Sequence, residues 1–159
     1  DALPISEFCF YGPMGYDIGN VIANMIFAWA NGDAAGAADF CKWVEDVLVD
    51  VINMTKEKME KYYDEHVTDT MCRNELYKKY YMDTIIEDTS AVAGLELIRR
   101  IVGMANVKDI TTIADEAKRA RAEKICITAA IDFIKNRSDK KCGKCFLKTL
   151  KDAIAEVDA

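Results

Sequence analysis

The chain contains little proline, a single histidine and no long apolar run. Its two prolines, Pro4 and Pro13, lie before residue 15, so nothing after them forbids helix. The one histidine, His66, lies among charged residues, as expected of an exposed or capping side chain, and leaves no local pattern for histidine-based zinc, haem or triad sites. No segment approaches the ~20 apolar residues that cross a bilayer. We therefore expect no transmembrane segment, no metal site, no cofactor and no enzyme.

An excess of basic charge is also absent. The 159 residues include 21 lysines and arginines against 27 aspartates and glutamates, which gives a formal net charge of -6. Sequence-independent binding to nucleic acid needs a basic face that contacts phosphates. The composition therefore argues against a nucleic-acid partner. Because 51% of the residues are hydrophobic, the chain has enough apolar material for a sizeable core.

The cysteines and two glycosylation motifs favour an extracellular protein. An even number of cysteines spread along a chain is typical of a disulfide framework. The motifs N-M-T and N-R-S place candidate glycosylation sites at Asn53 and Asn136. The chain starts at Asp1 without an initiator methionine, which we interpret as a mature chain whose signal peptide has been removed. We therefore predict a secreted, disulfide-bonded glycoprotein, with the bridges drawn from Cys9, Cys41, Cys72, Cys126, Cys142 and Cys145.

The C-x-x-C formed by Cys142 and Cys145 has three interpretations. A thioredoxin-like redox pair lies at a helix N-terminus directly after a strand, and a zinc site needs a second cysteine or histidine pair. The sequence offers neither a strand before the motif nor a second pair. We therefore favour two structural cysteines, one helical turn apart, that bridge different neighbours, with Cys41 and Cys72 as better partners than Cys126. Redox activity and metal binding are the alternatives.

Helical periodicity dominates the chain. The clearest pattern is at residues 40–52, where apolar side chains recur at i, i+3, i+4 and i+7 around Phe40, Trp43, Val44, Val47 and Leu48. Cap residues and weaker stripes predict further helices at about 17–31, 55–66, 69–87, 88–105, 110–136 and 138–157. We predict an all-α, disulfide-stapled bundle of six to eight helices in a single domain over residues 1–159, with residues 1–16 as an irregular N-terminal arm.

Aromatic and methionine side chains supply the candidate binding residues. In the first hypothesis the helices enclose an apolar cavity that carries a small, lipid-like hydrophobic ligand. Its lining residues would be Phe27, Trp29, Trp43, Met59, Tyr63 and Tyr81. In the alternative, the chain is a secreted effector, such as a salivary or host-directed parasite protein, and binds a protein partner through a tyrosine-rich surface around Tyr77, Tyr80 and Tyr81. The cysteine spacing fits neither the odorant-binding, the chemosensory nor the saposin pattern, so we assign no family.

Overall fold

A computed structural model describes residues 11–159, and over this range the protein is all-α with six helices. The helices are α1 (Tyr16–Ala34), α2 (Ala38–His66), α3 (Glu75–Ile101), the short α4 (Lys108–Thr111), α5 (Glu116–Lys135) and α6 (Gly143–Val157). A 3-10 turn at Arg137–Asp139 precedes α6. The all-α prediction is therefore confirmed. Of the predicted irregular arm, residues 1–10 lie outside the described residues.

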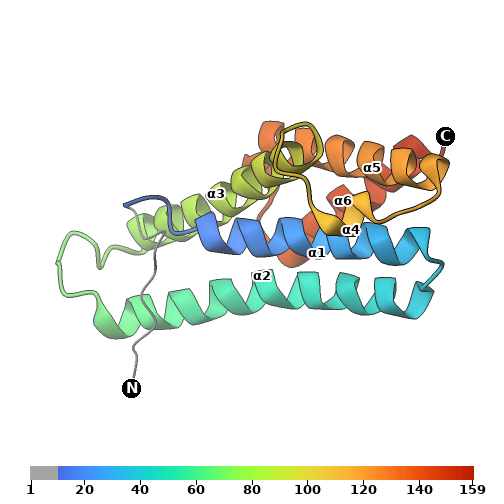
Figure 1. Cartoon of the computed structure of the whole chain (residues 1–159). Helices are drawn as coiled ribbons and strands as arrows, with labels where there is room; N and C mark the ends of the chain where they lie inside the picture. The colour runs from blue at the N-terminus through green and yellow to red at the C-terminus, as the bar shows by residue number, and fades with distance from the viewer. Residues whose placement is uncertain (1–10) are drawn as a thin grey trace, which may run out of the picture.

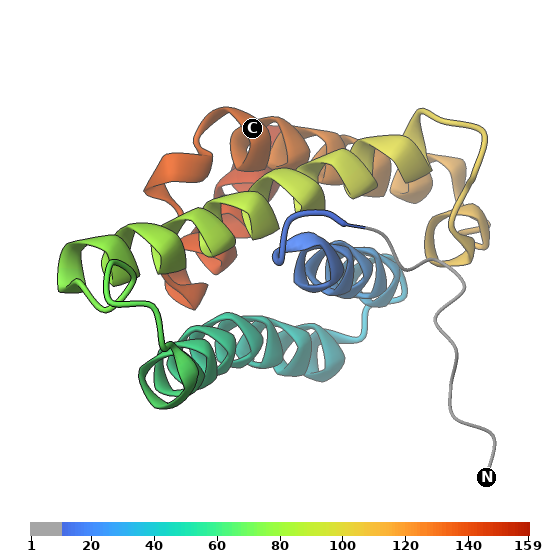
Figure 2. The same cartoon turned by 90° about the vertical axis from the view of Figure 1, so that its left-hand side faces the viewer.

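The long helices α1, α2 and α3 form one side of the molecule, and α5 and α6 complete the other. Figure 1 shows α1 and α2 running side by side in opposite directions, and Figure 2 shows α1 lying between α2 and α3. Helix α3 packs against both α1 and α5, while α6 packs between α5 and α2. The reversal from α1 to α2 passes through Gly36, whose φ of +75° lies in the left-handed region that favours glycine.

Aromatic and aliphatic side chains from all the long helices meet in one core. Phe27 of α1, Phe133 of α5 and Phe146 of α6 are fully buried, and the rings of Phe133 and Phe146 lie 5.3 Å apart. Aliphatic residues of α2 and α3 fill the remaining space, among them Leu48 and Leu97. Over the described residues, no helix combines the length and the hydrophobicity needed to span a membrane.

Two of the predicted helix boundaries do not exist. Residues 40–52 and 55–66 belong to the single helix α2, because no proline or glycine interrupts the polar stretch around Thr55. Residues 69–87 and 88–105 likewise merge into α3. The predicted cap at residues 88–90 lies inside α3, and two of its residues are buried. The Thr89 hydroxyl donates to the Ile85 carbonyl at 2.8 Å, and the Ser90 hydroxyl donates to the Phe133 carbonyl at 2.8 Å.

The true helix caps are asparagine and aspartate side chains nearby. The Asn74 Oδ1 atom accepts hydrogen bonds from the backbone N–H groups of Leu76 and Tyr77 at the start of α3. The Asp115 side chain caps the start of α5 by accepting a hydrogen bond from the Ala117 N–H. Within the predicted helix at 110–136, a new helix therefore starts at Glu116, and the first residues of this range belong to the short α4. Helix α6 starts at Gly143, later than the predicted residue 138.

The predicted disulfide framework is wrong for the described residues. Cys41, Cys72, Cys126, Cys142 and Cys145 are free thiols, and no pair among them lies at bonding distance. Cys41 and Cys126 are buried in the core as small apolar side chains, and Cys126 is fully enclosed. Cys9 lies outside the described residues. The helices are therefore held together by the core and by polar contacts between them.

The two asparagines of the sequons make contacts within the fold. Asn53 lies in the middle of α2, where its Oδ1 atom accepts the Gly143 N–H of α6 at 3.0 Å. Asn136 follows the last residue of α5, and its side chain donates to Asp132 at 2.6 Å. Both side chains therefore take part in helix packing or helix termination.

Candidate functional site

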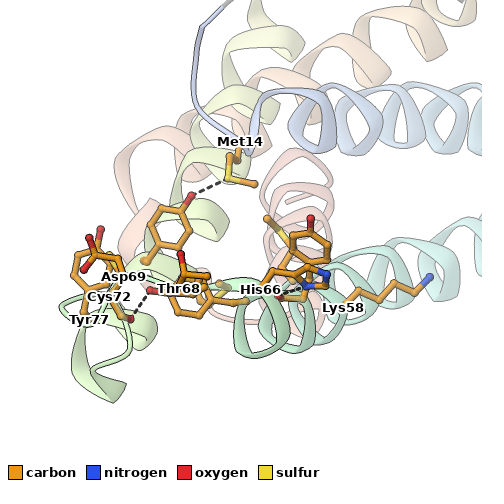
Figure 3. Close-up of a pocket in the computed structure, with 13 residues that line it drawn as sticks. Met14, Lys58, His66, Thr68, Asp69, Cys72 and Tyr77 are labelled. Carbon is orange, nitrogen blue, oxygen red and sulfur yellow. Dashed lines mark hydrogen bonds between the residues drawn. The ribbon is translucent and has the colours of Figure 1, made fainter. Parts of the chain in front are cut away.

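A large pocket opens where α2 ends and α3 begins. It has a volume of about 810 Å³ and is bounded by the last two turns of α2, residues 67–72, the first turns of α3 and Met14 from the segment before α1. Figure 3 shows these segments converging, with the Met14 side chain reaching in from above. Tyrosine and sulfur-containing side chains dominate the lining: Tyr62, Tyr63, Tyr77, Tyr81, Met14, Met59, Met82 and Cys72. Lys58, His66, Thr68 and Asp69 add polar groups.

Three tyrosine rings of this pocket form a connected cluster. The ring centroids of Tyr63 and Tyr81 lie 5.8 Å apart, and those of Tyr77 and Tyr81 lie 6.2 Å apart with nearly parallel planes. The Tyr63 hydroxyl donates to the Cys72 carbonyl at 2.7 Å, and the Tyr81 hydroxyl donates to the Met14 sulfur at 2.9 Å (Figure 3). The first contact ties α2 to the loop that follows it, and the second ties α3 to the segment before α1.

The pocket raises the pKa of two of its tyrosines, Tyr63 and Tyr77. Desolvation, followed by the nearby Cys72, raises the pKa of Tyr63, while for Tyr77 the nearby Cys72 is the first cause of a raised pKa and desolvation is the second. His66, the last residue of α2, is exposed as predicted, and its ring stacks on that of Tyr62 with 4.0 Å between the ring centroids. The lining is aromatic and rich in sulfur, and the hydroxyl groups of Tyr63 and Tyr81 already donate hydrogen bonds within the protein.

The structure brings together half of the predicted ligand-binding residues. Met59, Tyr63 and Tyr81 line this pocket. Phe27 and Trp29 do not, because both are buried in the core. Trp43 is 59% exposed on the outer face of α2, where its ring lies 5.9 Å from that of Phe40.

The position of Trp43 reflects a rotated buried face of α2. The apolar pattern places Phe40 and Trp43 inside, but the structure buries Cys41 and Glu45 beside the expected Val44 and Leu48. Glu45 tolerates burial because its Oε1 atom accepts the Trp29 indole N–H at 3.1 Å and also pairs with the Lys151 ammonium.

A second polar cluster lies at the end of α3. Glu96, only 6% exposed, accepts hydrogen bonds from Arg99 Nε at 2.7 Å and Arg99 Nη2 at 2.9 Å. Arg100 Nε donates to the same carboxylate at 2.8 Å, and Arg100 Nη1 donates to the Ala105 carbonyl at 3.2 Å. One buried carboxylate thus fixes two neighbouring guanidinium groups.

Sequence reasoning missed this arginine pair, although a signal was present. A glutamate three and four positions before two consecutive arginines is the spacing at which helical side chains meet. No group of three or more histidine, cysteine, aspartate or glutamate side chains in residues 11–159 is arranged to hold a metal ion.

Comparison with known proteins places the chain beside enzymes of one class, kinases. No protein-family profile matches it. It is similar to a methylthioribose kinase of rice, Oryza sativa subsp. japonica, with 33% identity over 150 residues that cover 82% of the chain and 34% of the rice protein. The methylthioribose kinases of Escherichia coli and Bacillus pumilus match with 29% and 31% identity, over 82% and 81% of the chain and 35% and 32% of their own lengths. The chain therefore spans about a third of the length of the curated relatives it matches.

These matches overturn the predicted function. A non-enzymatic carrier of lipid-like ligands and a secreted effector protein are both wrong, because the relatives are kinases from plants and bacteria. The predicted secretion, signal peptide and glycoprotein character are wrong for the same reason, since methylthioribose kinases are cytoplasmic enzymes.

Proposed function

We propose that this chain takes part in the phosphorylation of methylthioribose, as the helical portion of a kinase. The observation that carries the proposal is the similarity to the rice methylthioribose kinase over 82% of the chain. The match extends over most of the chain, so the helical core and its surface are both included. The chain's cytoplasmic location is part of the same proposal, and reduced cysteines support it.

We propose that Arg99 and Arg100 are the groups that serve this chemistry. Phosphoryl transfer gathers negative charge on oxygen atoms, and preorganised cationic donors stabilise that charge. The guanidinium group suits this task because its planar set of N–H donors matches phosphate oxygens. Glu96 holds both side chains in place, and the side chain of Arg99 remains 54% exposed and accessible to a ligand.

The pocket between α2 and α3 is the second candidate position for the sugar. Its thioether and tyrosine lining, which includes Met59, Tyr63 and Tyr81, suits a methylthio group because sulfur packs favourably against aromatic rings. Tyr81 and Arg99 are separated by 18 residues of one helix, or about 27 Å at a rise of about 1.5 Å per residue. The two positions therefore cannot hold the same small molecule at once.

A segment exchange tests the proposed function. The matched segment of the rice methylthioribose kinase is replaced by the corresponding residues of this chain, and the transfer of phosphate from ATP to methylthioribose is measured. We expect the exchanged kinase to remain active. A folded exchanged kinase without activity, beside an active rice parent, would overturn the proposal.

Point variants in the exchanged kinase then locate the sugar. We expect Arg99→Gln and Arg100→Gln each to lower the rate of phosphate transfer by about 100- to 1000-fold, the range for loss of one preorganised donor. Arg119→Gln is the matched control, because Arg119 is a partly exposed arginine in a long i,i+4 pair with Glu123 on α5. If Tyr81→Ala raises KM while both arginine variants stay active, the sugar lies in the pocket and the assignment to the arginine pair is wrong.

A further inference from the structure

The two thiols of the C-x-x-C motif lie against each other at the start of α6. The Sγ atoms of Cys142 and Cys145 are 3.2 Å apart, and both side chains are partly buried rather than enclosed. No other cysteine pair in residues 11–159 makes such a contact. A disulfide has an S–S length of about 2.05 Å, so closing the pair requires an approach of only about 1.1 Å.

The backbone around the motif is fixed by its neighbours. Cys142 is the N-cap residue of α6, and its carbonyl accepts the Cys145 N–H at 2.9 Å, which closes the first helical turn. The next residue, Gly143, donates its N–H to Asn53 of α2 at 3.0 Å. The first turn of α6, held by these hydrogen bonds, therefore brings the two sulfur atoms together.

The surroundings of the motif favour a thiolate at Cys145. Burial opposes ionisation, but hydrogen bonds from the Cys142 thiol and from the backbone of Lys141 and Cys142, with the nearby Lys140 ammonium, lower the pKa of Cys145 below the ordinary cysteine value. The N-terminus of α6 adds its positive end.

Acidic groups from the neighbouring helices pair with the two lysines that precede the motif. The Lys140 ammonium lies 2.5 Å from Asp132 of α5. The Lys141 ammonium lies 2.6 Å from Glu87 and 3.8 Å from Asp83 of α3. Each lysine is thus held beside the motif by a partner on another helix.

The buried cysteines have the opposite character. Burial raises the pKa of Cys126 to about 12 and also raises that of Cys41, so both are protonated and poorly reactive at neutral pH. Cys72 is partly buried in the tyrosine pocket and has no cysteine beside it among the described residues. These three thiols serve as internal comparisons.

We propose that Cys142 and Cys145 form a reversible dithiol–disulfide site whose substrate is a low-molecular-weight disulfide such as oxidised glutathione. The motif then closes on itself and does not bridge two other helices, in contrast to the interpretation drawn from the sequence. A preceding strand is not needed, because the helix start and the lysines supply the positive surroundings.

The exchange proceeds in two balanced steps. The Cys145 thiolate attacks one sulfur of oxidised glutathione, the glutathione S–S bond breaks, and the departing glutathione thiolate takes up the proton that Cys145 released. The Cys142 thiol then loses its proton and attacks the Cys145 sulfur, and the second glutathione leaves as a thiolate and takes up that proton. The two protein thiols are oxidised by two electrons in total, and one glutathione disulfide is reduced to two glutathione molecules.

Equilibration of the purified chain in glutathione buffers of stepped composition tests this site. Free thiols are alkylated, and peptide mass spectrometry measures each cysteine. As the oxidised fraction rises, we expect Cys142 and Cys145 to escape alkylation and to be recovered as an internal disulfide, two hydrogens lighter than the unmodified dithiol. Reduction should restore alkylation of both. Cys41 and Cys126 should become alkylatable only after unfolding. Separate glutathione adducts on Cys142 and Cys145, or no change at a composition that modifies Cys72, would overturn the proposal.

Serine variants assign the roles of the two sulfurs. Cys142→Ser should lose the internal disulfide and accumulate a stable glutathione adduct on Cys145, because the resolving thiol is absent. Cys145→Ser should lose the internal disulfide and react more slowly at Cys142. Cys72→Ser is the matched control and should leave the internal disulfide unchanged. If Cys145 in the Cys142→Ser variant reacts no faster than Cys72 at neutral pH, Cys145 is not the attacking thiol and the proposed mechanism is wrong.

Discussion

Helix α6 approaches α2 through Gly143 so closely that a methyl group has no room. A Cβ atom at this position would lie 2.3 Å from the Val49 carbonyl oxygen, and 2.7 and 2.8 Å from the Val49 Cα and carbonyl carbon. All three are backbone atoms of a helix interior, so no side-chain rotation relieves the overlap. Gly143→Ala therefore forces α6 away from α2.

The cost of Gly143→Ala follows from three contributions. Overpacking costs about 1–3 kcal/mol. A shifted α6 also weakens the 3.0 Å hydrogen bond from Gly143 N–H to Asn53, which contributes about 1 kcal/mol. The higher helix propensity of alanine returns up to about 1 kcal/mol. We expect a net loss of about 1–3 kcal/mol in the free energy of unfolding, or roughly 3–10 °C in Tm for a chain of this size.

Urea unfolding followed by far-ultraviolet circular dichroism measures this loss. Lys144→Ala is the matched control, since Lys144 is the next residue, is exposed, and should change stability by less than about 0.5 kcal/mol. Asn53→Ala should reproduce only the hydrogen-bond contribution of about 1 kcal/mol. A Gly143→Ala protein as stable as the parent would refute the close approach of α6 and α2.

Three further predictions concern buried polar groups. Ser90→Ala should destabilise the protein by about 1–3 kcal/mol in urea unfolding, because the buried Phe133 carbonyl near the end of α5 loses its hydrogen bond from the Ser90 hydroxyl. Thr112→Ala, the control at an exposed position, should not destabilise the protein to this extent. Glu45→Leu should cost about 1–3 kcal/mol and alter tryptophan fluorescence, because the Trp29 indole N–H loses its acceptor, whereas Glu45→Gln keeps an acceptor and should cost less. Burial opposes ionisation of Asp132, but hydrogen bonds from Lys140, Thr149 and Asn136 lower its pKa. The Asp132 carboxylate therefore stabilises the fold at pH values above the unfolded pKa of about 3.9. This contribution disappears as the pH falls through the lower pKa of the folded state. Stability measured from pH 7 to pH 2 should therefore fall less steeply for Asp132→Asn than for the parent; equal slopes would contradict the assignment.

The fold class was accessible from the sequence because helical periodicity is a local signal. Helix boundaries were harder to predict, because the sequence does not distinguish a serine or threonine that caps a helix from one in a helix interior. Ser90 lies inside α3 only because α5 presents the Phe133 carbonyl to its hydroxyl. Asn74, by contrast, caps α3 through residues two and three positions ahead, a contact that sequence alone could have suggested.

The buried face of α2 could not be predicted correctly because its decisive contacts are distant in the chain. Glu45 is buried since Trp29, 16 residues before it, and Lys151, 106 residues after it, both meet its carboxylate. Burial of Glu45 rotates the helix and exposes Trp43, which the hydrophobic pattern placed inside. The arginine pair differs from this case, because Glu96, Arg99 and Arg100 interact within one helical turn and their spacing already contains the signal.

The compartment prediction failed because a count of cysteines contains no information about which sulfur atoms meet. Cys126 is fully enclosed in the core and Cys41 contacts the Trp29 carbonyl at 3.5 Å, so each behaves as a small apolar side chain whose presence is independent of the others. An even number of such residues arises without any pairing. Cys142 and Cys145 are the exception among the described cysteines, because three positions at a helix start fix their separation locally, whatever the rest of the chain does. The spacing of the C-x-x-C motif was therefore informative about chemistry, whereas the total number of cysteines was not. Among the described cysteines, it is the pair at the start of α6 whose sulfur atoms lie in contact.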